Sequence, residues 1–342
     1  MPDRIRSKEK LVRRHAMAVI ATAAVATLLA ACGGAGEGAG GDATGAATDA
    51  GAEGGELTPV TVGVIPIVDV APIYLGVDQG FFEEEGLDVT LELAQGGAAI
   101  VPAVVSGQYQ FGFSNVTSLL LAAQKGVPLK AVAPGNFTTG KVGEDFAAIV
   151  APGESDIASA ADLVGKTVAV NTLNNIGDST VRKVVEDDGG DPSGVEFVEM
   201  GFPDMPAALS GGQVDAAWIL EPHLTRALQS GAEPVAWNFA ETDPDLLIAA
   251  YFTSEQFLSS DAETVEAFQA ALTRSFEYAQ ENPDDTRAIL DEYTEIDPAV
   301  KEAMVMPRFE TELSEDSMQL LADLAMQYGL TDEEIDVSTL LP

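Results

Sequence analysis

The chain has 342 residues, with 17 Lys and Arg against 55 Asp and Glu and a formal net charge of −38. This acidic excess argues against binding nucleic acid or anionic lipid by charge. One hypothesis for it is a high-salt habitat, where dense carboxylates keep a surface hydrated and charges are well screened; unfolding or aggregation in moderate salt would contradict that hypothesis. The length predicts two lobes rather than a single core.

Residues 1–31 have the pattern of an export signal. A basic segment that ends with Arg13 and Arg14 precedes an apolar run from Met17 to Ala31. This run is shorter than the ~20 residues that a membrane-spanning helix needs. Small residues at its end predict cleavage directly before Cys32. That position resembles the lipobox of bacterial lipoproteins, in which the cysteine becomes the acylated N-terminus; a signal peptide followed by a chance cysteine is the alternative.

Cys32 is the only cysteine in the chain, so we expect no internal disulfide. The segment that it begins, residues 32–56, otherwise contains Gly, Ala, Thr, Asp and Glu and no large apolar side chain. Such a segment cannot bury enough surface to offset its ordering entropy. It is predicted to be a flexible acidic tether, and no later segment is long and apolar enough to span a membrane.

The first folded part alternates short apolar strands with helices that end at glycines. β-Branched and alternating residues mark the strands, while Asp69, Gly97 and Ser114–Asn115 mark helix starts. The predicted strands are Val60–Ile65, Leu87–Leu93, Tyr109–Phe113 and Leu129–Ala133.

The same pattern restarts near Phe146, and after Ser259 only helices are predicted. Two α/β units in tandem predict the α/β class, with two parallel-rich sheets that carry helices on both faces. The second unit opens with an apolar segment, Phe146–Val150, and its predicted strands are Thr167–Val170, Val195–Met200, Val214–Leu220, Pro234–Phe239 and Leu247–Phe252. Its predicted helices are Asp178–Asp188, Pro203–Ser210 and one that starts at Pro222, and the final amphipathic helices are Asp261–Gln280, Pro283–Glu292, Pro298–Met304 and Ser314–Tyr328.

Four segments with a fixed order and spacing run over most of residues 60 to 255. They are Val62–Pro66 leading into Ala71–Leu75, Gln79–Val89, Gly96–Phe113 and Ala207–Pro222. Together they resemble the bacterial solute-binding family for aliphatic sulfonates, nitrate and thiamine-precursor pyrimidines. The resemblance implies a type II periplasmic-binding-protein fold with a hinged cleft and no catalysis. It also implies a discontinuous first lobe, residues 57–143 plus 256–342, and a second lobe of residues 144–255.

Candidate ligand contacts lie in the strand-to-helix loops, because ligands of open α/β sheets bind beyond the carboxyl ends of the strands. Free backbone N–H groups at helix starts could hold an anion without a basic side chain. The predicted ligand-binding residues are Pro66, Val68, Asp69, Ala71, Tyr74, Gly97, Ser114, Asn115, Phe137, Asn171, Asn174, Asn175, Gly177, Trp218 and Glu221.

Several of these residues also have a purely structural interpretation. Ser114 and Asn115 could cap their helix as well as contact a ligand, and Asn174–Asn175 could form an ordinary turn. Trp218 could stack on a ligand ring or lie in the core. Glu221 could accept a hydrogen bond from a ligand amine, or be the first-turn acid of its helix.

Two further polar residues are interpreted as structural. His223 is the only histidine after the leader. It lies in the first turn of a predicted helix, where we expect a surface or capping residue. We expect no metal site, because one His and one acylated Cys supply no metal-binding cluster. Lys141 is predicted to be a solvated lysine between the lobes.

These features predict an exported binding protein that captures a small molecule by lobe closure and delivers it to ABC permease and ATPase subunits. We expect a monomer anchored to the outer face of the cell membrane through Cys32, without cofactor, metal or nucleic acid. The sequence leaves two classes of ligand, a sulfonate- or nitrate-like anion and a heterocycle such as a pyrimidine. The alternatives are a ligand-sensing lipoprotein that signals to a membrane receptor, and a thiamine-pyrimidine biosynthetic enzyme, which would need a cleft Lys and a positioned His.

Overall fold

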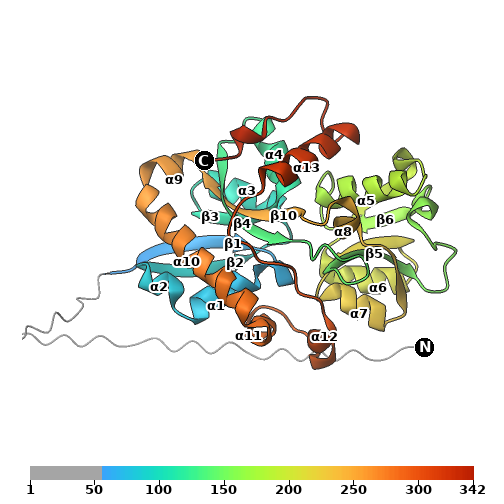
Figure 1. Cartoon of the computed structure of the whole chain (residues 1–342), viewed down its shortest axis with the longest axis horizontal. Coiled ribbons are helices and arrows are strands. Elements are labelled where there is room, and N and C mark those ends of the chain that lie inside the picture. The colour runs from blue at the N-terminus through green and yellow to red at the C-terminus, as the bar shows by residue number, and fades with distance from the viewer. Residues whose placement is uncertain (1–55) are drawn as a thin grey trace, which may run out of the picture. The chain divides into compact units, whose positions relative to one another are not determined.

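The computed structural model describes residues 56–342, which contain two five-stranded mixed sheets flanked by helices (Figure 1). The predicted export signal, Cys32 and the tether up to residue 55 lie outside the described residues. Within residues 56–342, no helix combines the length and the apolar character that crossing a membrane requires. The prediction of two α/β units is confirmed.

The first sheet has the strand order β2-β1-β3-β10-β4. Strand β1 runs parallel to β2 and β3, whereas β10 runs antiparallel to β3 and β4. The structure therefore differs from the predicted lobe boundary at residue 255, because the strand expected over Leu247–Phe252 pairs in the first sheet. Its apolar pattern indicated a strand but not which sheet would supply its partners. The bounds are β1 Thr58–Val64, β2 Leu87–Leu93, β3 Phe111–Asn115, β4 Leu129–Phe137 and β10 Leu247–Ser254.

The second sheet has the order β7-β6-β8-β5-β9, with β6 parallel to β7 and β8 and β5 antiparallel to β8 and β9. The strand predicted over Pro234–Phe239 ends early, and a short helix, α8 (Asn238–Thr242), follows. The Trp237 backbone N–H donates to the Glu241 carboxylate (2.7 Å), which starts this helix. The bounds are β5 Ala147–Pro152, β6 Thr167–Val170, β7 Glu196–Glu199, β8 Ala216–Leu220 and β9 Ala232–Ala236.

Helices cover both sheets, and several begin at side-chain caps. Asn115 caps α4 by accepting from the Ser118 N–H (2.9 Å), as its sequence position predicted. In the first lobe the helices are α1 Ala71–Asp78, α2 Phe81–Glu84, α3 Gly97–Val105 and α4 Val116–Gln124. In the second they are α5 Ile176–Asp187, α6 Met205–Ser210, α7 His223–Gln229 and α8.

The chain after β10 is helical, as predicted. Helix α10 packs against α1 and α2, and α13 packs against α4, so most of this segment covers the first sheet (Figure 1). Helix α12 instead contacts α7 of the second lobe. The helices are α9 Glu255–Ser260, α10 Ala262–Glu281, α11 Pro283–Ala288, α12 Pro298–Ala303 and α13 Glu315–Gln327.

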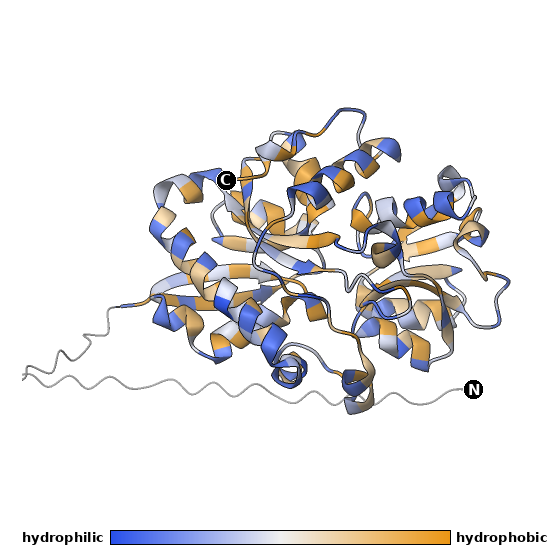
Figure 2. Ribbon diagram, in the orientation of Figure 1, coloured by the Kyte–Doolittle hydropathy of each residue, from blue (hydrophilic) through white to orange (hydrophobic). Residues whose placement is uncertain are grey.

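The apolar strands account for the position of the core. Strands buried on both faces carry near-continuous apolar runs, and β5, β8 and β10 are buried along almost their whole length. Figure 2 shows hydrophobic residues concentrated on the strands, while the helices carry hydrophilic residues on one side. The buried apolar residues of both sheets form one continuous cluster at the centre of the molecule.

Two segments, 138–146 and 237–246, connect the sheets. In the first, the buried Asp145 carboxylate accepts hydrogen bonds from the Thr138 hydroxyl (2.5 Å) and the Thr139 N–H (2.9 Å). Arg308 joins both segments, because its Nε donates to the Thr138 carbonyl (2.8 Å) and its Nη2 to Asp245 (3.1 Å). These contacts fix the ends of both connections where the lobes meet.

Candidate functional site

A narrow chamber of about 20 Å³ lies where strand-end loops of the two sheets face each other. One water needs about 10–15 Å³, so the chamber has room for little more than a water. Its walls are mainly apolar, with a few polar groups from each lobe. The lining residues are Ile65, Ile67, Asp69, Phe113, Asn115, Asn171, Ile176, Phe202, Trp218, Leu220, Ile248 and Ala249.

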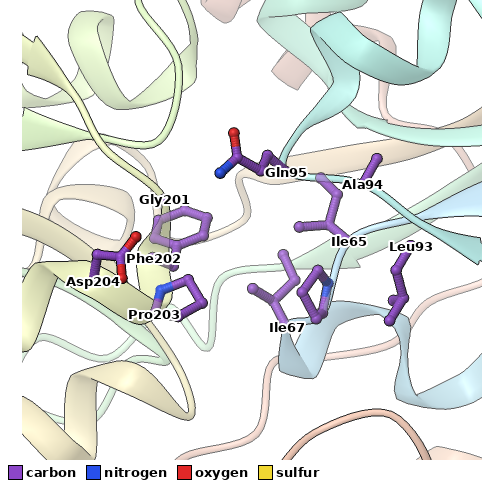
Figure 3. A pocket seen from close by; sticks show the side chains of 10 residues that line it. Ile65, Ile67, Leu93, Ala94, Gln95, Gly201, Phe202, Pro203 and Asp204 are labelled. Atoms are coloured by element: carbon purple, nitrogen blue, oxygen red, sulfur yellow. The ribbon is translucent and has the colours of Figure 1, made fainter. Parts of the chain in front are cut away.

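An outer cavity of about 240 Å³ adjoins this chamber. The two spaces share Ile65, Ile67 and Phe202, which form the wall between them. Figure 3 shows Phe202 on a loop of the second lobe, facing Ile65 and Ile67 of the first lobe across the cavity. The remaining lining residues are Pro66, Leu93, Ala94, Gln95, Gly201, Pro203 and Asp204. A ligand that reaches the chamber from this side must therefore displace Phe202 or enter while the lobes are apart.

Asp69 supplies the only carboxylate in the chamber wall, within the part of the chain that the structure describes. It lies in the 3₁₀ turn Val68–Val70 that leads into α1, and only 1% of it is exposed. Burial raises the pKa of its carboxyl group to about 7. Its own backbone N–H and the Asn136 amide lower that pKa, and the charge of Asp145 raises it. Its Oδ2 has no hydrogen-bond partner among residues 56–342. The free-energy cost of removing this acceptor from water is therefore not offset by a hydrogen bond within the protein.

Trp218 supplies the matching donor from the second lobe. Its indole is 2% exposed and lies edge-on to Phe202 and Phe239, with ring centroids 5.5 and 5.7 Å away. A Cβ at Gly177 would be only 2.5 Å from the ring, so a glycine is needed there. The indole Nε1 is buried and has no acceptor among the described residues. Trp218 therefore belongs to the core and to the chamber wall at once.

The asparagines of the chamber are held by neighbouring groups. Asn175 caps α5, since its Oδ1 accepts from the Gly177 N–H (2.9 Å), and its Nδ2 donates to Asn171 Oδ1 (2.7 Å). This contact orients Asn171 in the chamber wall. Asn115 is fixed by Ser118, whose hydroxyl accepts from its Nδ2 (3.0 Å). Asn115 therefore both caps its helix and lines the chamber.

The charge of the two spaces disfavours an anion. Within residues 56–342, neither the chamber nor the outer cavity is lined by a Lys, Arg or His, whereas Asp69 and Asp204 are acidic. An anion there would lie beside carboxylates without a cation to compensate it. No cluster of three or more His, Cys, Asp or Glu that could hold a metal ion occurs in the described part.

The structure brings some of the predicted site residues together and places others elsewhere. Asp69, Asn115, Asn171 and Trp218 line the chamber, and Pro66 lines the outer cavity. The remaining predicted residues are not among those that line either space: Val68, Ala71, Tyr74, Gly97, Ser114, Phe137, Asn174, Asn175, Gly177 and Glu221. Ligand contact by any of the fifteen stays a prediction.

In the first lobe, these remaining residues have local packing roles. The Val68 N–H donates to the Glu221 carbonyl of the second lobe (3.2 Å). Tyr74 stacks on Tyr293 with centroids 4.0 Å apart. A Cβ at Gly97 would be 1.7 Å from Ser114 Oγ, so these two residues pack directly together. Ala71 begins α1, and Phe137 forms a bridge with Arg308.

In the second lobe, Asn174 has a positive φ of 55°, which fits the turn interpretation. Glu221 is 1% exposed, and its carboxylate accepts from the Thr225 hydroxyl (2.7 Å), the Thr225 N–H (3.0 Å) and the Val305 N–H (3.3 Å). Burial raises the pKa of Glu221 to about 7, and these hydrogen bonds lower it. The carboxylate thus joins the second lobe to the C-terminal segment.

The interpretation of His223 as a surface or capping residue is wrong. Only 6% of it is exposed, and it lines a third cavity of about 390 Å³. Tyr293 and the residues after it line the same cavity. They belong to a segment 70 residues further along the chain, whose approach local sequence does not reveal. Lys141 is exposed, as predicted.

Sequence reasoning missed several residues of the chamber, among them Phe202 and the pair Ile248–Ala249. Phe202 follows strand β7 and precedes α6, so the rule that selected the other strand-to-helix loops would have found it. Ile248 and Ala249 lie within β10, whose place in the first sheet was not apparent from the sequence.

Comparison with known proteins agrees with this fold. The chain is 26% identical over 227 residues to the formylaminopyrimidine-binding protein of Halalkalibacterium halodurans, covering 64% of each protein. It is 26% identical over 213 residues to the taurine-binding periplasmic protein of Escherichia coli, covering 60% of this chain and 62% of that one. The matches thus span slightly less than two thirds of the length of these relatives.

Among solved structures, the alkanesulfonate-binding protein SsuA from Xanthomonas axonopodis pv. citri, bound to MOPS, aligns with a TM-score of 0.71 at 19% identity. The alignment covers 84% of this chain and 99% of SsuA. The desulfurization enzyme DszB also aligns, with a TM-score of 0.61 at 14% identity, over 83% of this chain and 96% of DszB. The chain therefore has the periplasmic-binding-protein fold, and that fold is found in binding proteins and in an enzyme.

The family model described as NMT1/THI5 like matches residues 67–286. This match spans more than half of the chain and includes every residue that lines the chamber except Ile65. The protein therefore belongs to the NMT1/THI5-like family.

Proposed function

We propose that this protein is the extracytoplasmic solute-binding component of an ABC importer and that it binds an aminopyrimidine-like heterocycle between its lobes. Two of its relatives are named for a bound compound, a formylaminopyrimidine-binding protein and a taurine-binding protein. The family and the fold support the class, and the chamber supports the choice of ligand.

One observation carries the choice of ligand. Asp69 of the first lobe and Trp218 of the second line the same chamber, and each carries a buried polar atom without a partner among the described residues: the acceptor Asp69 Oδ2 and the donor Trp218 Nε1. An aminopyrimidine has an exocyclic N–H group for the first and a ring nitrogen for the second. Its flat ring also suits the aromatic walls that Phe202 and Trp218 provide.

The same groups argue against the anionic ligands. A sulfonate or nitrate would need donors or cations around its oxygens, and neither cavity has a basic side chain within residues 56–342. The raised pKa of Asp69 also disfavours an anion. A second negative charge beside Asp69 would raise this pKa further, and the carboxyl group would then carry a proton and no longer be a hydrogen-bond acceptor.

Asp69 and Trp218 belong to different lobes, and a ligand that binds both of them would therefore favour lobe closure. The chamber is too small to hold a ring, so the lobes must separate for the ligand to enter and must close around it to a wider spacing than in this structure. A ligand that pairs with both groups binds the closed arrangement better than the open one and shifts the population toward it. The permease would then distinguish the closed from the open form.

Two other functions remain alternatives. A biosynthetic enzyme would need a lysine and a histidine beside the ligand, and in the described structure His223 lies in a separate cavity while neither of the two joined spaces is lined by a lysine. A ligand-sensing lipoprotein would use the same chamber and the same closure, so its distinguishing feature is a receptor in place of a permease.

The ligand proposal predicts a specific order of affinities. Calorimetric titration should show saturable binding of 4-aminopyrimidine and its N-formyl derivative. Pyrimidine without the amine should bind roughly tenfold more weakly, because it leaves Asp69 without a donor, a loss of about 1.4 kcal/mol or more. Taurine, ethanesulfonate and nitrate should not raise the melting temperature. Tight binding of a sulfonate with none of the aminopyrimidine would contradict the proposal.

The anchoring proposal predicts a change in location on replacing Cys32. When the full chain is expressed in a bacterium that processes lipoproteins, the wild type should fractionate with membranes and incorporate labelled palmitate. Cys32→Ser should remove the only thiol available for acylation and leave the protein soluble outside the cytoplasm or unprocessed. Equal membrane association of both proteins would show that another segment holds them there.

A further inference from the structure

The third cavity, of about 390 Å³, is separate from the chamber and lies between the lobes on another side of Pro66 and Pro203. One wall comes from the C-terminal part of the first lobe, at Tyr293–Ile296. The other comes from the second lobe, at Pro222, His223 and Arg226. Its volume is in the range of sites for small organic molecules.

His223 is the unusual feature of this cavity. Its side chain is 94% buried, since its exposed fraction is 6%, and neither ring nitrogen has a hydrogen-bond partner among the described residues. Burial lowers the pKa of the imidazole to about 4, the charge of Arg226 lowers it further, and the Pro66 carbonyl acts weakly in the opposite direction. The ring is therefore neutral at pH 7, with one N–H donor and one acceptor nitrogen, and a buried polar group of this kind normally has partners.

Arg226 places a positive charge at the same cavity. It is the only basic residue apart from His223 that lines any of the three spaces between the lobes in the described structure. Its Nη2 donates to the Glu295 carbonyl of the first lobe (3.1 Å), which holds the guanidinium across the gap between the lobes. A guanidinium has five donors in a planar fork that matches a carboxylate.

The remaining walls are mixed. Pro66, Pro203, Pro222 and Ile296 contribute apolar surface, whereas Tyr293, Thr294 and Glu295 are polar. Glu295 is an exposed residue whose backbone carbonyl accepts from Arg226, so the guanidinium is the one positive charge of the site and the imidazole a neutral donor beside it. A monovalent acid with an apolar group matches this better than phosphate or sulfate, whose extra charge would meet no second cation in a chain with a formal net charge of −38.

We propose that this cavity is a second binding site, which takes a small organic carboxylate whose charge pairs with Arg226 and whose oxygen accepts from the His223 imidazole. The site does not rest on the proposed function, because it shares neither Asp69 nor Trp218 with the chamber.

The test uses benzoate as the probe and the nitrogen resonances of the histidine as the readout. The full chain has only two histidines, His15 and His223, and the His223 signals are assigned by their loss in His223→Phe. Benzoate added to wild-type protein at pH 7 should shift these signals in a saturable way at millimolar concentration, the range of weak specific binding. Benzamide, which has the same shape without the charge, should shift them at least tenfold more weakly.

Variants separate this site from the chamber. Arg226→Gln, at a partly exposed position, should weaken benzoate binding about tenfold or more, as expected for the loss of a charge-assisted contact. Asp69→Asn should leave benzoate binding unchanged. The proposal is overturned if the His223 signals of the wild type do not respond to benzoate, if benzamide acts equally well, or if Asp69→Asn removes the response while Arg226→Gln keeps it. None of these outcomes depends on whether aminopyrimidines bind.

Discussion

Asp69→Asn is expected to weaken aminopyrimidine binding about 10- to 100-fold and to make the ligand-free protein more stable at pH 8. A hydrogen bond to a charged group contributes about 1.5–3 kcal/mol, and each 1.4 kcal/mol is a factor of ten in affinity. The substitution keeps the shape of the side chain but replaces the charged acceptor by a neutral amide. Stability should rise because the carboxylate is buried with one oxygen unpaired.

The gain in stability should depend on pH in a defined direction. Asp69 has a pKa of about 7 in the folded protein against 3.8 for an exposed aspartate. Between these values the folded state binds more protons than the unfolded state, so the free energy of unfolding of the wild type falls as pH rises from about 4 to 7. The asparagine has no such loss. The difference in melting temperature between variant and wild type should thus be small near pH 4 and largest at pH 8, as scanning calorimetry can measure.

Asp145→Asn is the matched control. Asp145 is as buried as Asp69, but its carboxylate accepts hydrogen bonds from Thr138 Oγ1 (2.5 Å) and the Thr139 N–H (2.9 Å). Replacing it should therefore destabilise the protein. If Asp69→Asn folds and keeps the wild-type affinity for the aminopyrimidine, Asp69 is not the ligand's acceptor.

Trp218→Ala is expected to lower the free energy of unfolding by about 3–5 kcal/mol, the usual result of removing a buried tryptophan. The ring fills the space between Phe202, Phe239 and Gly177, so its loss leaves a cavity in the second lobe. Because the same ring lines the chamber, aminopyrimidine binding should also be lost. Denaturant unfolding and calorimetric titration measure the two effects.

Two further variants separate packing from ligand contact. Trp218→Phe keeps most of the ring but removes the indole N–H, so it should lower affinity about tenfold with a smaller loss of stability. Phe239→Leu removes part of the packing on Trp218 from a residue that does not line the chamber. It should destabilise the protein and leave affinity within a few-fold of the wild type. If Trp218→Phe kept the wild-type affinity while Phe239→Leu lowered it, Trp218 would be a core residue that makes no hydrogen bond to the ligand.

Local sequence patterns were sufficient for the elements and for the individual loops. The alternation in Leu87–Leu93 and the glycine stops predicted strands and helices that the structure contains. The rule that ligands lie beyond strand ends selected Asp69, Asn115, Asn171 and Trp218, and all four line one chamber. These features depend on periodicity and on turn chemistry, which act over a few residues.

The tertiary structure alone decided which elements meet. The sequence marked Leu247–Phe252 as a strand, but only pairing with β3 and β4 placed it in the first sheet, next to the chamber. It marked His223 as an isolated histidine at a helix start, whereas in the structure His223 is 6% exposed and lines a cavity together with Tyr293, 70 residues away. The burial that raises the pKa of Asp69 and lowers that of His223 likewise comes from distant segments. Desolvation is set by everything that surrounds a group in space, and local sequence reports only the neighbours along the chain.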